Sequence, residues 1–233
     1  MRTISRKLWS IVFLTALCCW SCLAFSQPLV AVKNEAYSAY YSLEYCVPVM
    51  VVYNLVPSDF VGNQKLRSRH FKVDTQLPPP RIKANALNGS GYVRGHLCAA
   101  ADRDTDKGRL KQTYLTSNMA PMTMTCNSGA WKNLEDSCRY LAETHGSLTI
   151  IAGCLFPQHN YGLQCIGRVA IPTYFYRVAI CNVHHGEVWC WICPNTLAAS
   201  KPIRMGTNLL QQVIQPAAAT TLLSRMMPKI YPR

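Results

Sequence analysis

The stretch Gly89–Arg103, GSGYVRGHLCAAADR, places an Arg-Gly-His tripeptide directly after a glycine-rich turn. In an extended strand alternate side chains point to the same side, so Arg94 and His96 share one face and Gly95 leaves room between them. An arginine fork matches phosphate oxygens, and neutral imidazole accepts a proton near neutral pH. The tripeptide alone is equally typical of an ordinary basic loop, so its meaning depends on the residues around it.

The downstream segment Thr113–Glu135, TYLTSNMAPMTMTCNSGAWKNLE, adds side chains that suit phosphodiester cleavage. Asn127 can offer its amide oxygen to a hard cation. Glu135 follows Trp131 by one helical turn and therefore borders the buried face of a helix, where a carboxylate needs an arginine, a metal or a metal-bound water as partner. The structural alternative makes Asn127 a helix cap and places Glu135 in an ion pair.

The remaining pattern predicts an α+β fold with a mixed central β-sheet and flanking helices. Val47–Leu55 is rich in valine and is typical of a strand, and Leu148–Leu155 is an apolar run typical of a buried one. Apolar residues recur at helical spacing over Ser128–His145, and Gly146 ends that helix. Further strands are expected at Ala170–Cys181 and Val188–Cys193, and a helix at Asn208–Gln215.

The segment Met1–Ser26 has the pattern of a signal peptide. Three basic residues precede an apolar run over Leu8–Phe25, and Ala24–Ser26 has the small-x-small form of a cleavage site. We therefore expect one mature domain over residues 27–233, with a core at about 47–196, that is secreted or periplasmic. An uncleaved membrane anchor and a lipoprotein are the alternatives for this segment. No later segment is long and apolar enough to span a bilayer, so the mature form is expected to be free of the membrane.

The charge of the chain predicts a polyanionic partner. Loss of Met1–Ser26, with its three basic residues and no acidic one, would lower the formal net charge from +13 to +10. A soluble exported chain with this excess of basic residues is expected to bind nucleic acid, the commonest polyanion, and an anionic membrane surface is the alternative. The basic stretch Lys65–Lys72, which contains Arg67 and Arg69, adds to this expectation.

The cysteines predict an oxidised protein. Nine of the twelve lie beyond Ser26, and the odd number leaves at least one free or paired with another chain. Cys154 and Cys165 flank a ten-residue loop and are expected to form a disulfide worth about 3 kcal/mol. By spacing alone, Cys181-x-x-His184 with Cys190-x-x-Cys193 could bind zinc, but their position on an expected hairpin favours cysteine pairing or burial.

The whole set of motifs resembles the DNA/RNA non-specific endonucleases, the ββα-metal (His-Me finger) nucleases that include endonuclease G. That family carries Asp-Arg-Gly-His followed by small residues and an acidic stretch, then Tyr-Leu-Ser-Asn-x-x-Pro, then Asn-x-x-x-Trp-x-x-Leu-Glu. The corresponding residues here are Arg94-Gly95-His96, Ala99–Asp102, Tyr114–Asn118 with Pro121, and Asn127, Trp131, Leu134 and Glu135. Upstream, Arg67–Asp74 resembles the family's basic stretch, and the resemblance covers about Val49–Asn195.

The resemblance implies a Mg²⁺- or Mn²⁺-dependent phosphodiesterase that cleaves both DNA and RNA with weak sequence selectivity. His96 would be the general base, Asn127 the direct metal ligand, and Glu135 the holder of a metal-bound water. Arg94 with Arg67 or Arg69 would stabilise the phosphate in the transition state, and Asn118 is expected to contact the substrate. The oligomeric state is left open, a homodimer included.

Val93 stands where the family usually has aspartate. This departure makes a catalytically weakened or inactive nucleic-acid-binding protein the second hypothesis. A disulfide-rich secreted protein that binds another polyanion is the third. The intact set of His96, Asn127 and Glu135 favours the nuclease, and the order of helix and strand motifs disfavours the third hypothesis.

Overall fold

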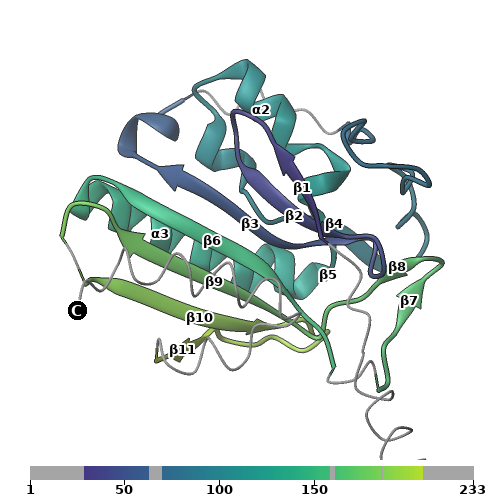
Figure 1. The fold of residues 1–233 in the computed structure, drawn as a ribbon. Coiled ribbons are helices and arrows are strands. Elements are labelled where there is room, and N and C mark those ends of the chain that lie inside the picture. Colours follow the sequence, from purple (N-terminus) through teal and green to yellow (C-terminus); the bar gives the residue numbers. More distant parts are fainter. Residues whose placement is uncertain (1–28, 63–69, 158–160, 185, 207–233) are drawn as a thin grey trace, which may run out of the picture.

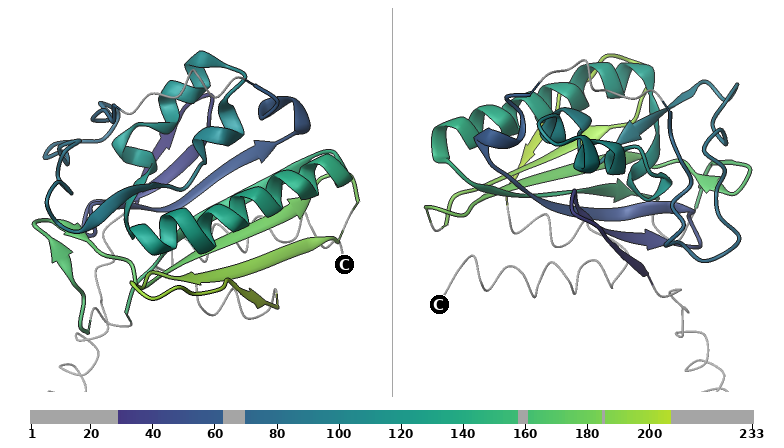
Figure 2. Two further views of the ribbon diagram at one scale, coloured as in Figure 1. Left: turned by 180° about the vertical axis from the view of Figure 1, so that it is seen from behind. Right: turned by 90° about the horizontal axis from the view of Figure 1, so that it is seen from above.

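The computed structural model describes residues 29–62, 70–157, 161–184 and 186–206. Within them, seven strands form one sheet in the order β1-β2-β3-β6-β9-β10-β11, and helix α3 lies along one face of it (Figures 1 and 2). The expected α+β class is confirmed. The expected mixed sheet is wrong, because every described pairing in this sheet is antiparallel. Short connections join β1 to β2, β2 to β3 and β9 to β10, and such hairpins give antiparallel neighbours.

The elements have the following bounds. The large sheet contains β1 (Val30–Lys33), β2 (Ser38–Ser42), β3 (Val47–Leu55), β6 (Leu148–Leu155), β9 (Tyr174–Cys181), β10 (Val188–Pro194) and β11 (Ile203–Met205). Two smaller pairs are β4 (Tyr92–His96) with β5 (Met119–Thr123), and β7 (Cys165–Ile166) with β8 (Val169–Ala170). The helical elements are η1 (Pro57–Asp59), η3 (Ala100–Arg103), α2 (Lys107–Thr113), η4 (Thr116–Asn118), the π-helix η5 (Cys126–Trp131) and α3 (Lys132–His145).

The sequence pattern located most of these elements. The strands expected at Val47–Leu55 and Leu148–Leu155 are β3 and β6, and the expected strand at Val188–Cys193 is β10 less one residue. The expected strand Ala170–Cys181 divides, because Ala170 belongs to β8 and β9 begins at Tyr174. The expected helix from Ser128 begins earlier, as a π-helix. The signal peptide and the helix expected at 208–215 lie outside the described residues. No helix among those residues is long and apolar enough to cross a membrane.

The large sheet is buried on both faces, as strand β9 shows. Phe175 and Ala179 belong to the core cluster that includes Trp131 of the helical layer, whereas Tyr176 and Val178 belong to a second cluster on the opposite face. This alternation follows the two-residue repeat of a strand.

The predicted disulfide between Cys154 and Cys165 is wrong. All nine cysteines in the described residues are free; Cys154 is fully buried in the core, whereas Cys165 is exposed on the β7–β8 pair. A loop short enough to close says nothing about where its end residues point, and β6 turns Cys154 inward. Two other thiols do meet, since the Sγ atoms of Cys126 and Cys193 lie 3.4 Å apart.

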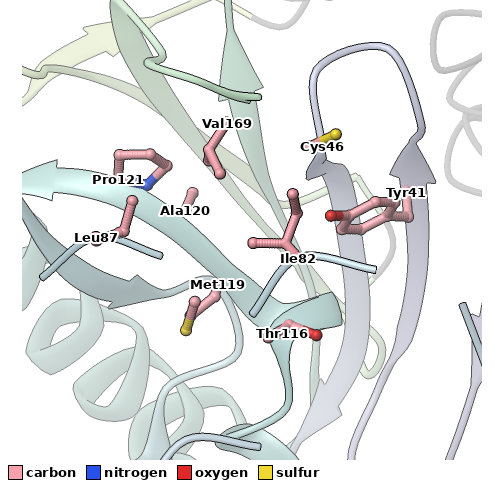
Figure 3. A pocket seen from close by; sticks show the side chains of 9 residues that line it. All are labelled: Tyr41, Cys46, Ile82, Leu87, Thr116, Met119, Ala120, Pro121 and Val169. Carbon is pink, nitrogen blue, oxygen red and sulfur yellow. The ribbon is translucent and has the colours of Figure 1, made fainter. Parts of the chain in front are cut away.

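A small apolar cavity lies between the β2–β3 hairpin and β5 (Figure 3). Its volume is about 10 Å³, which is close to the space of a single water. The lining residues are Tyr41, Cys46, Ile82, Leu87, Thr116, Met119, Ala120, Pro121 and Val169. Its size excludes a substrate, so this cavity is a packing feature of the core.

Candidate active site

The Arg-Gly-His tripeptide lies on β4, which pairs with β5 and is followed along the chain by η5 and α3. This order, two paired strands and then a helix, is the ββα arrangement expected from the motifs. Gly95 packs closely against Met122, because a Cβ atom there would lie 2.2 Å from the Sδ atom and force that side chain to move. Alternation along β4 then directs Arg94 and His96 to the face away from Met122.

His96 is fixed through both its backbone and its ring. Trp131 donates from Nε1 to the carbonyl oxygen of His96 at 2.9 Å, which ties β4 to the start of the helical layer. The ring of Phe71 lies 5.1 Å from the imidazole, and the ring of Tyr114 meets it edge-on at 4.9 Å. The imidazole is therefore positioned by aromatic neighbours from two other segments of the chain.

His96, Asn127 and Glu135 line one pocket of about 280 Å³. The other lining residues are Ala99, Ala100, Ala101, Tyr114, Ser128, Lys132 and Arg139. Asn127 lies in the π-helical turn η5, a distortion that is frequent at functional sites because it redirects side chains locally. Among the described residues, no hydrogen bond holds the side chain of Asn127. Its amide oxygen is therefore available to a ligand in the pocket.

Glu135 is a nearly buried carboxyl group that forms an ion pair with Arg177 and lies near Arg139. Its side chain is 16% exposed, and Oε1 lies 3.6 Å from Nη2 of Arg177. Burial raises the pKa of Glu135 to about 7, although the charge of Arg177 acts in the opposite direction. Asp102 adds to the increase through charge repulsion. A cation bound in the pocket would favour the ionised carboxylate.

Arg177 lies directly beneath the pocket and is fully buried. It donates from Nη1 to the hydroxyl of Tyr53 at 3.1 Å, and from Nη2 to the carbonyl oxygen of Leu97 at 3.1 Å. Its guanidinium carbon lies 4.4 Å from the ring centre of Trp131, a cation–π contact. The motifs do not point to this residue, whose only signal in the sequence is a lone charge within the apolar run of β9.

Asp102 completes this buried layer. It is fully buried and accepts from the hydroxyl of Tyr53 at 2.7 Å and from Nη1 of Arg139 at 2.6 Å. Arg139 is in turn one of the residues that line the pocket. The acidic residue after the Arg-Gly-His motif therefore supports the pocket from behind instead of facing the substrate.

Arg94 lies beside the His96 pocket and not within it. Its Nη1 atom donates to the carbonyl oxygen of Ala84 at 3.0 Å, and its guanidinium carbon lies 4.9 Å from the ring centre of Phe71. Phe71 thus contacts both Arg94 and His96, which places the two side chains on the same side of β4. Arg94 lines a neighbouring pocket of about 280 Å³ with Asn88, Gly89 and Tyr92. Arg67 and Arg69 lie outside the described residues.

The expectation that Asn118 contacts the substrate is wrong. This residue is fully buried. Its Oδ1 atom accepts from the backbone N–H of Cys98, and Nδ2 donates to the carbonyl oxygens of Cys98 and Thr113. Both amide hydrogens are therefore used within the protein, and Asn118 connects the segment after β4 to the end of α2.

Val93, the residue that departs from the family motif, packs inward. It is half-buried, contacts the main core cluster and pairs with Met122 across the β4–β5 ladder. It also lines the pocket that contains Arg94. An aspartate at this position would therefore border both the core and an opening to solvent.

Comparison with known proteins identifies the family of the chain. Residues 24–208 match the family described as DNA/RNA non-specific endonuclease. A nuclease of Nostoc sp. is 34% identical over 125 residues, which are 53% of this chain and 44% of that protein. Human mitochondrial endonuclease G is 31% identical over 175 residues, 70% of this chain and 59% of that protein. The chain spans about half the length of the curated relatives it matches.

The fold has a solved counterpart in the crystal structure of the EndoG/EndoGI complex. That chain superposes with a TM-score of 0.71 at 24% identity, over 82% of this chain and 85% of that one. The chain belongs to the DNA/RNA non-specific endonuclease family and is endonuclease G-like. Enzymes of this family are hydrolases that act on phosphodiester bonds, and they are typically metal-dependent.

Proposed function

We propose that this protein is a Mg²⁺- or Mn²⁺-dependent endonuclease that hydrolyses both DNA and RNA without sequence preference. One observation carries the proposal: His96, Asn127 and Glu135 come from β4, η5 and α3 and converge on a single pocket. A proton acceptor, an unengaged amide oxygen and a carboxyl group in one solvent-open pocket are what hydrolysis of a phosphodiester requires.

The donor atoms in this pocket fit a hard cation. Asn127 offers an amide oxygen that no described residue occupies, and Glu135 offers a carboxylate whose Oε1 atom forms an ion pair with Arg177 at 3.6 Å. Oxygen donors with room for water match Mg²⁺, which keeps several waters when protein-bound. We propose that Asn127 contacts the ion directly and that Glu135 holds it through water. When bound, the ion offsets the negative charge on the leaving oxygen.

The protein's own groups perform the remaining chemistry. A water oxygen attacks phosphorus while His96 takes its proton, and the phosphorus–oxygen bond to the leaving group breaks. Phe71 and Tyr114 hold the imidazole in place for this transfer. Arg94 also contacts Phe71, so it lies close enough to His96 to bind a phosphate of the same strand. Such contacts position nucleic acid but do not read its bases, so we propose weak sequence selectivity.

We also propose that the protein acts after export, as a secreted or periplasmic enzyme. The basic start and apolar run of Met1–Ser26 support this proposal, and so does the excess of basic residues, which suits a polyanionic substrate. The second candidate function, nucleic-acid binding without cleavage, is favoured by a single observation, the valine at position 93. The same assay separates the two functions.

The test is degradation of supercoiled plasmid and of single-stranded RNA, with EDTA and then with added Mg²⁺ or Mn²⁺. We expect cleavage of both substrates, loss of cleavage with EDTA and recovery with either ion.

Asn127→Ala should raise the Mg²⁺ concentration for half-maximal rate by roughly 10-fold or more, since the loss of partners in the outer shell alone costs ~10–100-fold. Asn133→Ala, which changes an exposed asparagine in the first turn of α3, is the matched control. Binding without cleavage would instead support the second candidate, and an unchanged Mg²⁺ requirement in Asn127→Ala would exclude Asn127 as a direct ligand.

A further inference from the structure

A second cluster of ligand side chains lies at the end of α3 opposite to the pocket. His145 is the last residue of α3, Cys181 is the last residue of β9, and Glu187 immediately precedes β10. One ligand atom from each of the three lies within 4.8 Å of the others. The closest of these contacts joins Nδ1 of His145 to Oε2 of Glu187 at 3.0 Å.

The backbone holds the three residues in these positions. The N–H of Cys181 donates to the carbonyl oxygen of Glu187 at 3.0 Å, which closes the β9–β10 turn. The N–H of Asn182 donates to the carbonyl oxygen of Ser147 at 2.9 Å, which joins this turn to the loop after α3. Gly146, with φ of 89°, ends the helix directly after His145. The cluster is therefore pre-organised by main-chain contacts.

The chemistry of the cluster selects a particular kind of ion. A thiolate, an imidazole and a carboxylate are together typical ligands of Zn²⁺, whereas the thiolate is a poor ligand for Mg²⁺. Cys181 is buried, and its Sγ atom accepts the backbone N–H of His184 at 3.1 Å, a contact that fixes the position of the sulfur. Tetrahedral zinc with ordinary bond lengths needs ligand atoms roughly 3.3–3.6 Å apart, so small side-chain rotations suffice.

We propose that His145, Cys181 and Glu187 bind a structural Zn²⁺ ion that joins the C-terminal end of α3 to the β9–β10 turn. Binding releases the thiol proton of Cys181 to solvent and uses the neutral imidazole of His145. Three protein ligands leave one coordination position open. The imidazole of His184, whose ring centre lies 6.1 Å from that of His145, is a candidate for this position, and water is the alternative.

This set differs from the one that sequence spacing offered. Cys190 lies in the cluster on the opposite face of the sheet, and Cys193 lies beside Cys126. Neither Cys190 nor Cys193 is part of the group that includes Cys181. The zinc ligands proposed here combine Cys181 with Glu187 and with His145, which lies far earlier in the chain, on α3. Only the folded chain brings His145 to the turn.

The test uses the purified chain, stripped with a chelator and titrated with Zn²⁺ or Co²⁺. We expect one equivalent of Zn²⁺ to bind, a thiolate-to-cobalt charge-transfer band with Co²⁺, and a rise of roughly 5–10 °C in the unfolding midpoint at 100-fold excess over Kd. Cys181→Ser should remove the band. It should also weaken zinc binding by at least ~100-fold, because outer-shell partners alone cost ~10–100-fold.

The controls keep the test independent of folding and of the catalytic pocket. Glu187→Gln preserves the shape of an exposed side chain that is not needed for the core, and it should weaken zinc binding while the metal-free chain stays folded. Cys190→Ser and Glu143→Gln are the matched cysteine and glutamate controls, and Asn127→Ala should retain the cobalt band. Absence of zinc binding, or equal zinc affinity in wild type and Cys181→Ser, would overturn the proposal and leave only a His145–Glu187 ion pair beside a buried thiol.

Discussion

The wall of the candidate active site and the layer of side chains beneath it are built in opposite ways. In the wall, the side chain of Asn127 has no hydrogen bond to any described residue, and Glu135 has one cation at 3.6 Å. In the layer beneath, Arg177 and Asp102 are fully buried and each makes at least two hydrogen bonds. Polar groups that make few hydrogen bonds within the protein, at a surface open to solvent, are available to substrate and metal. Buried polar groups without partners would instead destabilise the fold.

This difference predicts that changes in the two regions have separable effects. Substitutions in the wall should lower turnover with little loss of stability, because they remove groups that the fold does not use. Substitutions beneath it should lower stability, because they leave a buried partner unsatisfied. Glu135 belongs to both regions, since it lines the pocket and also faces Arg177, so its substitution should change both turnover and stability.

The largest effect is expected for His96→Ala. Loss of a general base typically lowers turnover ~10²–10⁴-fold. Cleavage of plasmid at saturating Mg²⁺ measures the rate, and binding of DNA in EDTA should change little. The rate of the wild type should fall as the pH drops, because imidazolium cannot accept a proton, and this dependence should be lost in the variant. Near-normal cleavage by His96→Ala would contradict the proposed mechanism.

Arg177→Met should produce the second effect, on stability. The substitution keeps a long side chain over Trp131 but leaves Glu135 without its ion-pair partner, which costs about 3–5 kcal/mol. Urea unfolding measures the loss. The loss should shrink as the pH falls, because the carboxyl group of Glu135, whose pKa burial raises to about 7, can then take up a proton. Lys132→Met, which removes an exposed lysine paired with Asp136, should change stability by less than about 1 kcal/mol.

If Arg177→Met and Lys132→Met unfold at the same urea concentration as the wild type, the buried layer has no greater role in stability than the exposed wall. The distinction between the two regions would then fail. Loss of cleavage without loss of stability in Arg177→Met would place this arginine in the catalytic machinery instead.

Glu135→Gln tests the residue that belongs to both regions. Turnover should fall by roughly 10–100-fold, the usual cost of losing an outer-shell metal partner. The stability of Glu135→Gln, in contrast, should exceed that of the wild type at high pH. Burial raises the pKa of Glu135 to about 7, so the folded chain holds a proton that the unfolded chain has already released above about pH 5.

The unfolded state therefore binds fewer protons than the folded state over this range, and the stability of the wild type falls as the pH rises through about 5 to 8. Relative to the wild type, Glu135→Gln should gain up to about 3 kcal/mol between these limits without metal. Urea unfolding at pH 5 and pH 8 in EDTA measures the gain. The same stability difference at both pH values would show that the carboxyl group titrates as an exposed one does.

The wall was predictable from sequence, whereas the layer beneath it was not. His96, Asn127 and Glu135 lie in one linear order of motifs, and strand and helix periodicity places each on a known element. Arg177 lies in β9, well beyond the last of these motifs, and joins the site only through the pairing of β6 with β9. A buried arginine in an apolar strand is a recognisable signal, because such a charge needs partners, but the sequence does not name them.

The predictions that Asn118 contacts the substrate and that Cys154 pairs with Cys165 were wrong for a related reason. A motif position shows that a residue type is needed, but not whether it faces the substrate or the interior, and Asn118 faces the interior. Loop length shows that Cys154 and Cys165 could meet, but the side-chain direction on β6 decides that they do not. Both properties depend on the direction of side chains after long-range strand pairing.

Val93→Asp is expected to have the smallest effect. Its effects on stability and on activity should again be separable. The carboxylate would lie on the half-buried face of β4 opposite Met122, so stability should fall by about 1–2 kcal/mol. The same position opens into the pocket of Arg94, where the charge can help orient that arginine, so activity per folded molecule should be equal or higher.

Val93→Asn, which has the shape of the aspartate without its charge, is the matched control. Thermal unfolding and plasmid cleavage well below the unfolding midpoint measure the two effects separately. A large drop in cleavage by the folded Val93→Asp chain, with Val93→Asn unaffected, would mean that this active site has been rebuilt around an apolar neighbour.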